Sequence, residues 1–545
     1  MSCAARVDHA RGWGGLAVTL GGAVAVFWAF DALPFMDLPA HAGLIALRRD
    51  LLSSPFEQRY YVLATHFGAY SLFRGLGDLL ARALGPVGAV RALATLSVVA
   101  LPLSLLDARR RLHGEASPAS GFAGIILGFG LMTLFGFATY MLGVAGLVTC
   151  MALWLELLFG AHPARSPRPW WGRALAVAAA SALLFVTHGF AFVLFLTCAG
   201  LTWLVAVASA RSAPAGEAHD RPAASLASLA TLLPAVSLAA YAAWVERSES
   251  VPPGASAAPQ PRTGLLFQPL LDKLSLLATP TLMTRTGLDL VVGAAVWAIA
   301  IASLAAAVTW LRRHPAPGAP GGRRARDCTR ALLACEILLA AAFCAMPHEI
   351  GWFGFVDARL LLVLLVFALL CVPPDAIGPR LAAARERALP ALACVVVALA
   401  LVTSYRFQGE AGAYREVLAR VPPFTRLLNL PEDPNSDVFT GHPFVHYDKL
   451  VLADRPVLVS DLWFHQGSGV YPRPGNPVLR LPADYVTSNL RPVDWGQFDL
   501  SDWDYVLVRT RPSAPPPAAP ASLRLATHSG GWWLYATGAL TDGRR

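Results

Sequence analysis

Long, nearly uncharged stretches alternate with short polar segments over most of the chain. A helix of roughly 20 apolar residues crosses the hydrocarbon layer of a membrane. Because lipid offers no hydrogen-bond partners to the backbone, we predict that each stretch is helical. Eleven spans are predicted, at 13–33, 87–106, 121–138, 140–159, 173–187, 189–210, 225–245, 288–311, 331–347, 356–373 and 388–404.

Two parts of this pattern need a separate interpretation. The run 173–210 is too long for one span, and we divide it at Thr187-His188-Gly189. The segment 59–85, within the first long connection 34–86, is apolar but interrupted by charged residues. We predict that it forms one or two amphipathic helices on the outer membrane interface rather than a span.

The last part of the chain, 405–545, has a different pattern. Residues 411–430 have the periodicity of an amphipathic helix, and short β-rich runs follow at 456–460, 505–509 and 532–535. The proline-rich stretch 512–520 predicts a loop. The predicted fold is therefore mainly α: a polytopic transmembrane helical bundle over 1–404, followed by a small exported α/β domain over 405–545.

Composition supports a membrane protein. Hydrophobic residues make up 55% of the chain, charged residues only 14%, and the mean hydropathy is +0.51. The net charge of +9 comes almost entirely from arginine, since lysine occurs only at Lys273 and Lys449. We attribute this excess to biased composition and expect no nucleic-acid partner.

The arginines also predict an orientation. With the N-terminus in the cytoplasm, every inside connection is basic, as at Arg109-Arg110-Arg111, whereas the tight outside connections near Thr139, His188 and Gly351 have no Lys or Arg. This arrangement places 405–545 outside the cytoplasm. The spacing of the cysteines and histidines matches no metal site.

Ionisable residues gather at one predicted level, the outer boundary of the membrane. Such residues are costly in lipid and are candidates for function. We select them as catalytic or substrate-binding candidates. They are Asp37, His41, His188, His348, Glu349, Asp357 and Arg359.

Structural roles are alternatives for each candidate. Asp37 precedes Leu38-Pro39 and suits a helix N-cap. His188 can be a hydrogen-bonded residue at a helix end, and Asp357 and Arg359 can pair with neighbours near the headgroups. Several residues of the exported part can stack on sugar rings or simply fill its core. These are His442, His446, Trp463, His465 and Trp495.

Four segments resemble the GT-C superfamily of polytopic glycosyltransferases, especially bacterial members without an assigned substrate. They are Asp37-Leu38-Pro39-Ala40-His41, Gly136-Phe137-Ala138-Thr139-Tyr140-Met141-Leu142-Gly143, Thr187-His188 and Asp357-Ala358-Arg359-Leu360. The resemblance implies a catalytic base at Asp37 and a donor sugar, hexosyl or pentosyl, on a polyprenyl phosphate or diphosphate. It also implies residence in a bacterial inner (plasma) membrane, with membrane lipids and a glycan, lipid or protein acceptor as partners.

The chain departs from the family pattern in two places. Thr139 stands where such proteins commonly have Asn, and the first outer loop lacks a DxD or Glu-Asp pair. We therefore expect neither a metal nor another cofactor. Two other functions remain open: a transporter or lipid flippase that uses the same charges as a solute pathway, and a non-catalytic membrane scaffold whose exported domain binds a partner.

Overall fold

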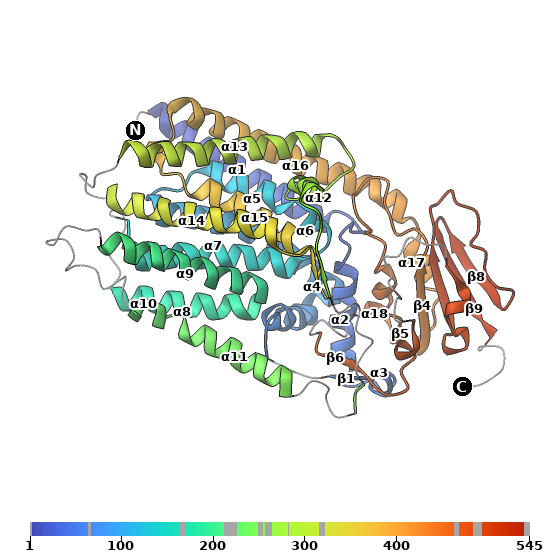
Figure 1. The fold of residues 1–545 in the computed structure, drawn as a ribbon. Coiled ribbons are helices and arrows are strands. Elements are labelled where there is room, and N and C mark those ends of the chain that lie inside the picture. The colour runs from blue at the N-terminus through green and yellow to red at the C-terminus, as the bar shows by residue number, and fades with distance from the viewer. Residues whose placement is uncertain are drawn as a thin grey trace.

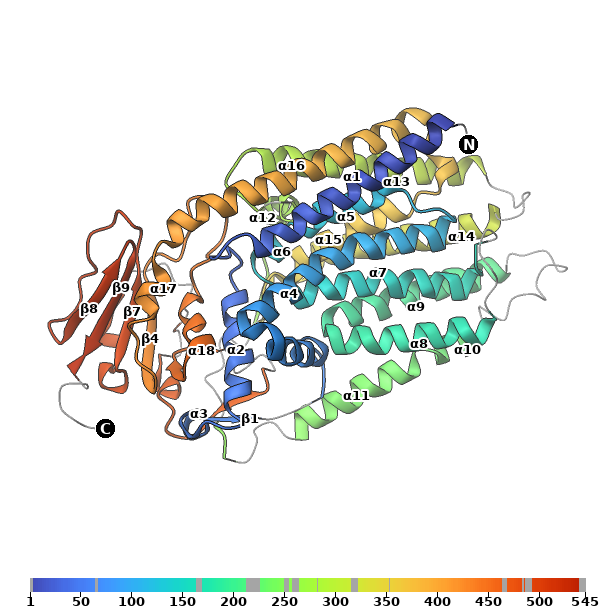
Figure 2. The same cartoon turned by 180° about the vertical axis from the view of Figure 1, so that it is seen from behind.

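The computed structural model has a bundle of long helices with a small β-sheet at one end, which we call the sheet end (Figure 1). Helix α1 (Cys3–Trp28) begins at the opposite end of the bundle, and the last strand, β9 (Trp532–Thr537), belongs to the sheet (Figure 2). The described residues are 3–63, 67–162, 169–211, 226–248, 254–256, 264–281, 283–314, 322–351, 353–462, 468–482, 485 and 493–538.

The longer helices of the bundle follow the predicted spans in order. They are α1 (Cys3–Trp28), α4 (Ser71–His113), α5 (Pro118–Gly128), α7 (Ala138–Phe159), α8 (Trp170–Thr187), α9 (Gly189–Arg211), α11 (Leu233–Ser248), α13 (Leu288–Arg313), α14 (Gly322–Ala345), α15 (Val356–Leu370) and α16 (Pro379–Ala411). Short helices lie between them: α2 (Leu38–Asp50), α3 (Pro55–Tyr60), α6 (Leu131–Leu134), α10 (Leu226–Ala230) and α12 (Leu270–Ser275).

Seven of the described helices are long and apolar enough to cross a membrane, namely α4, α7, α8, α9, α13, α14 and α16. The predicted count of eleven spans is not confirmed. Helices α5 and α15 have only 11 and 15 residues, and every residue of both is buried. Neighbouring helices surround both elements, so their largely apolar composition alone does not establish that they cross the membrane.

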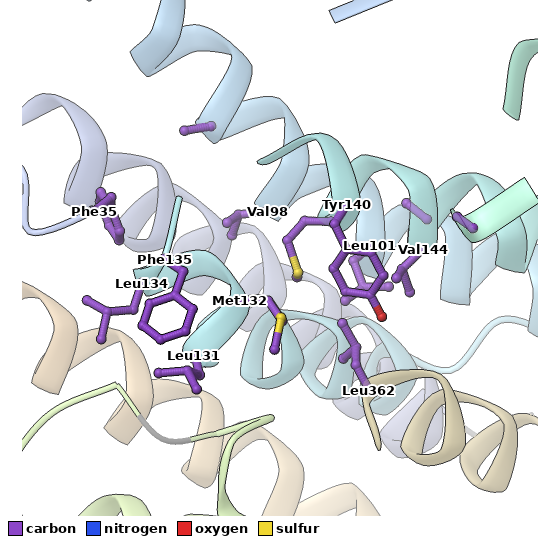
Figure 3. Close-up of a cluster of buried hydrophobic side chains, with 14 of the residues drawn as sticks. Phe35, Val98, Leu101, Leu131, Met132, Leu134, Phe135, Tyr140, Val144 and Leu362 are labelled. Atoms are coloured by element: carbon purple, nitrogen blue, oxygen red, sulfur yellow. The ribbon is translucent and has the colours of Figure 1, made fainter. Parts of the chain in front are cut away.

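The centre of the bundle is a continuous apolar core. Figure 3 shows part of it, where side chains from the α1–α2 connection, α4, α6, α7 and α15 meet. Phe35 and Leu134 lie at one side of this cluster, Tyr140 and Leu362 at the other, and Met132 between them. The core therefore extends to the sheet end, where α2 and α6 begin.

The interfacial segment 59–85 is only partly helical. Residues Tyr61–Leu63 form strand β1, residues 64–66 lie outside the described part, and α4 begins at Ser71. Gly85, with φ +70°, breaks α4 into an initial piece and a long apolar piece. The helix prediction is wrong for β1 because this strand pairs antiparallel with β6 (Val470–Pro472), a partner about 400 residues away in sequence.

A five-stranded mixed sheet forms the C-terminal part, in the order β5-β4-β7-β9-β8. The strands are β4 (Thr425–Pro431), β5 (Val457–Val459), β7 (Tyr505–Arg509), β8 (Leu523–Ser529) and β9 (Trp532–Thr537). β4 runs parallel to β5 and β7, whereas β9 is antiparallel to β7 and β8. The three predicted β-rich runs correspond to β5, β7 and β9, and the proline-rich stretch is a loop.

The helix predicted over 411–430 is wrong. α16 ends at Ala411, a short helix α17 (Tyr414–Leu418) follows, and β4 begins at Thr425. Pro422 and Pro423 stop helical structure, and β4 is buried between two strands. A strand buried on both faces has a continuous apolar pattern, which periodicity does not distinguish from a helix.

The two predicted domains are joined by more than one connection. α16 passes through residues 404 and 405 without a break. The 3-10 helix η4 (Tyr447–Leu450) and α18 (Val451–Asp454) pack on α2, so close that a Cβ at Gly43 would lie 3.1 Å from the Lys449 carbonyl oxygen. The domain boundary at residue 404 remains a prediction. The connection 34–86, which contains α2 and β1, packs against the C-terminal part of the chain.

Candidate functional site

Asp37 is held at the start of α2 by the hairpin that precedes α7. The Met36 and Asp37 amides donate to the carbonyl oxygens of Leu134 and Phe135, at 2.9 and 3.1 Å. Gly136 has φ +78°, and a Cβ there would lie 2.8 Å from the Asp37 amide nitrogen. Two segments of the family resemblance, 37–41 and 136–143, are therefore in direct backbone contact.

The Asp37 carboxylate does not cap α2, although it occupies the N-cap position. Instead Oδ1 lies 3.7 Å from His446 Nε2, a residue of the C-terminal part. Burial raises the pKa of Asp37 well above its ordinary value, attraction to Arg359 opposes this rise, and Asp461 adds to it. A carboxyl group with a raised pKa in a protected site has the properties of a general base.

Two imidazoles accompany Asp37. His41 lies one turn further along α2, and its ring centroid is 4.9 Å from that of Phe73. Burial lowers the pKa of His41 to about 4. Burial also lowers the pKa of His446, and the positive charge of Lys449 reinforces the effect. Both rings are therefore neutral near pH 7, and each offers one N–H donor and one acceptor nitrogen.

Arg359 supplies a buried positive charge at the start of α15. Its guanidinium lies 4.1 Å from the Phe353 ring centroid and 4.4 Å from that of Phe137. Nη2 donates to the Gly354 carbonyl oxygen at 3.2 Å, and among the described residues no carboxylate lies within 4 Å of the guanidinium. This cation is thus stabilised by rings and one carbonyl group, which leaves donor capacity for an anion.

His188 lies between α8 and α9 and is 1% exposed. Its Nδ1 accepts a hydrogen bond from the Ala191 amide at 3.2 Å, so it caps α9. The ring makes edge contacts with Tyr70 and Tyr140, and the Tyr140 hydroxyl donates to the Arg359 carbonyl oxygen. The capping role of His188 is therefore present in the structure, and Tyr140 contacts both the His188 ring and the Arg359 guanidinium.

His348 and Asp357 form a second, separate network. His348 Nδ1 lies 2.8 Å from Asp357 Oδ1, and Lys273 Nζ lies 3.3 Å from Asp357 Oδ2. Lys273 also donates to the carbonyl oxygen of Phe343 at 2.9 Å and to that of Met346. These contacts satisfy the C-terminal carbonyl groups of α14, so this network ties α12, α14 and α15 together. Glu349 lies beside it in the short strand β3 (Glu349–Ile350) and is partly exposed.

The structure thus brings together Asp37, His41, His188 and Arg359, whereas His348, Glu349 and Asp357 lie in or beside the Lys273 network. Sequence reasoning placed His446 only as a stacking or core residue, and it selected neither Lys273 nor Lys449. Trp463 and His465 lie outside the described residues.

The sequence carries one signal for the lysines, because a chain whose other basic residues are arginines contains only two of them. Both lysines are buried in the structure. Lys449 Nζ lies 3.0 Å from Asp448 Oδ2, and Asn429 Nδ2 donates to Asp448 Oδ1 at 3.0 Å. Burial raises the pKa of Asp448 to about 6, against the attraction of Lys449. A buried Lys–Asp pair therefore lies next to the helix that carries Asp37.

The described side chains contain no group of three or more His, Cys, Asp or Glu residues suited to hold a metal ion. Two cavities are present at the sheet end, one beside α2 and one between α5, α7 and α15, and neither is lined by Asp37 or Arg359. Around Asp37 the structure places the His446 ring, His41 one helical turn further along α2, and the Arg359 guanidinium, whose charge acts on the Asp37 carboxyl group.

No protein-family model and no curated protein matches the chain. Among solved structures, the chain is similar to ArnT from Cupriavidus metallidurans, both bound to undecaprenyl phosphate and in the apo state, with a TM-score of 0.51 and 14% identity. These comparisons cover 98% of this chain and 99% and 100% of ArnT. The chain is also similar to arabinofuranosyltransferase AftD from Mycobacteria, with a TM-score of 0.46, 16% identity, and coverage of 96% of this chain and 40% of AftD.

The ArnT comparison extends over nearly the whole of both chains and confirms the predicted fold class, a helical bundle followed by a small C-terminal sheet region. Together with the seven apolar helices, this fold identifies an integral multi-pass membrane protein.

Proposed function

We propose that this protein is a membrane glycosyltransferase that moves a sugar from a polyprenyl-phosphate-linked donor to a hydroxyl group of an acceptor. The observation that carries the proposal is a buried carboxyl group, Asp37, in the electrostatic field of a buried guanidinium, Arg359, which forms no salt bridge with a carboxylate among the described residues. The ArnT fold supports it, since one of the ArnT structures is bound to undecaprenyl phosphate.

The proposed reaction needs a base and an anion site. Asp37, as the carboxylate, takes the proton of the acceptor hydroxyl group while that oxygen bonds to the anomeric carbon. The bond from the anomeric carbon to the phosphate oxygen breaks, and the polyprenyl phosphate leaves with the electron pair. Arg359 stabilises that phosphate through N–H groups directed at its oxygens.

The histidines have supporting roles in this proposal. His41 and His446 flank Asp37 as neutral rings and orient either the carboxylate or the acceptor hydroxyl. His188 contributes a ring beside Arg359 and fixes the junction of α8 and α9. His348, Glu349 and Asp357 were expected to bind substrate. Because Lys273 and the α14 carbonyl groups already engage Asp357 and its neighbours, we assign His348 and Asp357 to support of α15.

The partners we propose are a lipid-linked sugar donor, membrane lipids, and a glycan, lipid or protein acceptor. We place the protein in a bacterial inner membrane with the C-terminal sheet outside the cytoplasm. The basic connection at Arg109-Arg110-Arg111 lies at the end of α4 remote from the sheet, in agreement with this orientation.

Replacement of Asp37 tests the proposal. The D37N variant keeps the size of the side chain but removes the base, so we expect the transfer rate to fall by about 100-fold or more. The measurement is release of polyprenyl phosphate from a panel of polyprenyl-phosphate hexoses and pentoses in reconstituted membranes, with membrane extracts as acceptor.

Asp78 provides the matched control, because it lies on α4 and pairs with Arg48 at 2.8 Å. The D78N variant should keep activity, and both variants should reach the membrane in equal amounts. Full activity of D37N would refute the assigned base. Movement of intact lipid or solute by both the wild type and D37N, without release of polyprenyl phosphate, would favour the transporter alternative.

A further inference from the structure

A cleft lies on the side of α2 that faces away from Asp37. It is open to solvent and is lined by residues of the α1–α2 connection, α2, α4, α17 and η4. Leu38, Pro39 and Ala42 form its wall on α2, whereas Asp37 and His41 lie on a different face of the same helix. Val87 and Val90 of α4 form the opposite wall, so the interior of the cleft is apolar.

The mouth of the cleft carries a positive charge. Arg415 and Asp31 form an ion pair in which Nε and Oδ2 are 2.6 Å apart, and their side chains are 54% and 62% exposed. Arg91 donates to backbone groups, through Nη2 to the Asp31 carbonyl oxygen at 2.7 Å and through Nη1 to that of Phe27 at 3.2 Å. The lining residues therefore include two guanidinium groups and one carboxylate, and their net charge is +1.

The cleft lies where headgroups meet the helices. Arg91 is near the start of the apolar piece of α4, whose Leu96 and Leu103 side chains are exposed on the bundle surface. Trp28, at the end of α1, is 45% exposed, and its indole Nε1 donates to Thr95 Oγ1 at 2.9 Å. An exposed tryptophan beside arginines at the end of apolar helices is typical of the interface between hydrocarbon and headgroups.

We propose that this cleft binds the phosphate headgroup of an anionic membrane lipid, with the start of its acyl chain against the apolar wall. Arg91 and Arg415 bind the phosphate, and the Asp31 carboxylate occupies the phosphate position when no lipid is bound. Because the Asp31–Arg415 pair is more than half exposed, exchanging one anion for the other costs little. This site is independent of the proposed transfer reaction, since it shares no residue with the cluster around Asp37.

Lipid retention by the purified full chain tests the proposal. Dioleoylphosphatidylglycerol and dioleoylphosphatidylcholine are titrated separately onto the protein in detergent, and bound lipid is counted by native mass spectrometry. We expect preferential retention of phosphatidylglycerol, about threefold weaker in R415Q and about threefold tighter in D31N, which is the effect of one exposed ion pair. The R420Q variant, at an exposed arginine outside the cleft, should behave as the wild type.

The opposite effects of the two variants distinguish binding from damage, because a misfolded protein does not retain lipid more tightly. Equal retention of the two lipids, or unchanged retention in both R415Q and D31N, would overturn the proposal. Stabilisation of the wild type by inorganic phosphate, without retention of phosphatidylglycerol, would also overturn it and would indicate a free-phosphate site.

Discussion

At the scale of single residues, the candidate site combines local and distant information. The spacing of Asp37 and His41 predicts that both lie on one face of a helix, and they do so on α2. His446 lies 3.7 Å from Asp37, but no periodicity connects two residues separated by about 400 positions. The sequence therefore predicts Asp37 and His41 as site residues but not the contact of Asp37 with His446.

The pH dependence of activity should report the Asp37–His446 contact. Since burial raises the pKa of Asp37, the carboxylate base is lost by protonation at a pH well above the ordinary aspartate value of about 3.9. Activity should thus fall as the pH decreases through this raised pKa. In H446L the carboxylate loses a polar neighbour, so its pKa should rise further and the acid limb of kcat/KM should move to higher pH.

A control variant separates this effect from a structural one. His528 lies on β8 and stacks on Trp533 at 3.9 Å, remote from Asp37 in the C-terminal sheet. H528L should leave the midpoint of the pH profile unchanged. If H446L lowers the rate equally at all pH values, His446 supports the fold and does not position the base.

At the scale of elements, the hairpin before α7 shows why a glycine is needed. Gly136 combines a positive φ with direct contact to the Asp37 backbone. In the G136A variant, the left-handed conformation costs about 1–2 kcal/mol, and the added methyl group displaces Asp37. We expect a lower melting temperature and a much larger loss of transfer activity.

Gly475 gives the matched comparison for G136A. It has φ +84°, and nothing lies within 4 Å of a Cβ placed there. G475A should show a similar decrease in melting temperature, measured in the same detergent, with little change in transfer activity. Equal activity losses in the two variants would contradict the role of Gly136 in positioning Asp37.

The sequence predicts helices best where apolar runs are long, and it predicts secondary structure worst where contacts with distant residues determine it. The helices α7, α9 and α13 follow their predicted spans closely, because length and composition suffice for a helix in lipid. β1 and β4 were missed, since one depends on a distant partner strand and the other has the uniform apolar pattern of a buried strand.

At the scale of the whole molecule, the orientation across the membrane is a testable consequence of the charge pattern. The exposed residues Ser513 and Arg110 lie at opposite ends of the molecule, in the sheet region and at the remote end of α4. In intact cells, a membrane-impermeant maleimide should label S513C above the wild-type background. R110C should be labelled only after permeabilisation, and the reverse pattern would contradict the proposed orientation.

The pairing of β1 with β6 has a consequence for biosynthesis. A ribosome that has delivered every bundle helix to the membrane has not yet made η4, β6 or His446. The nascent protein therefore carries Asp37 and His41 without His446, and α2 lacks the surface on which it packs. Translation order alone keeps the candidate centre incomplete until the chain is nearly finished, so an inserted but truncated product should be inert toward lipid-linked sugars.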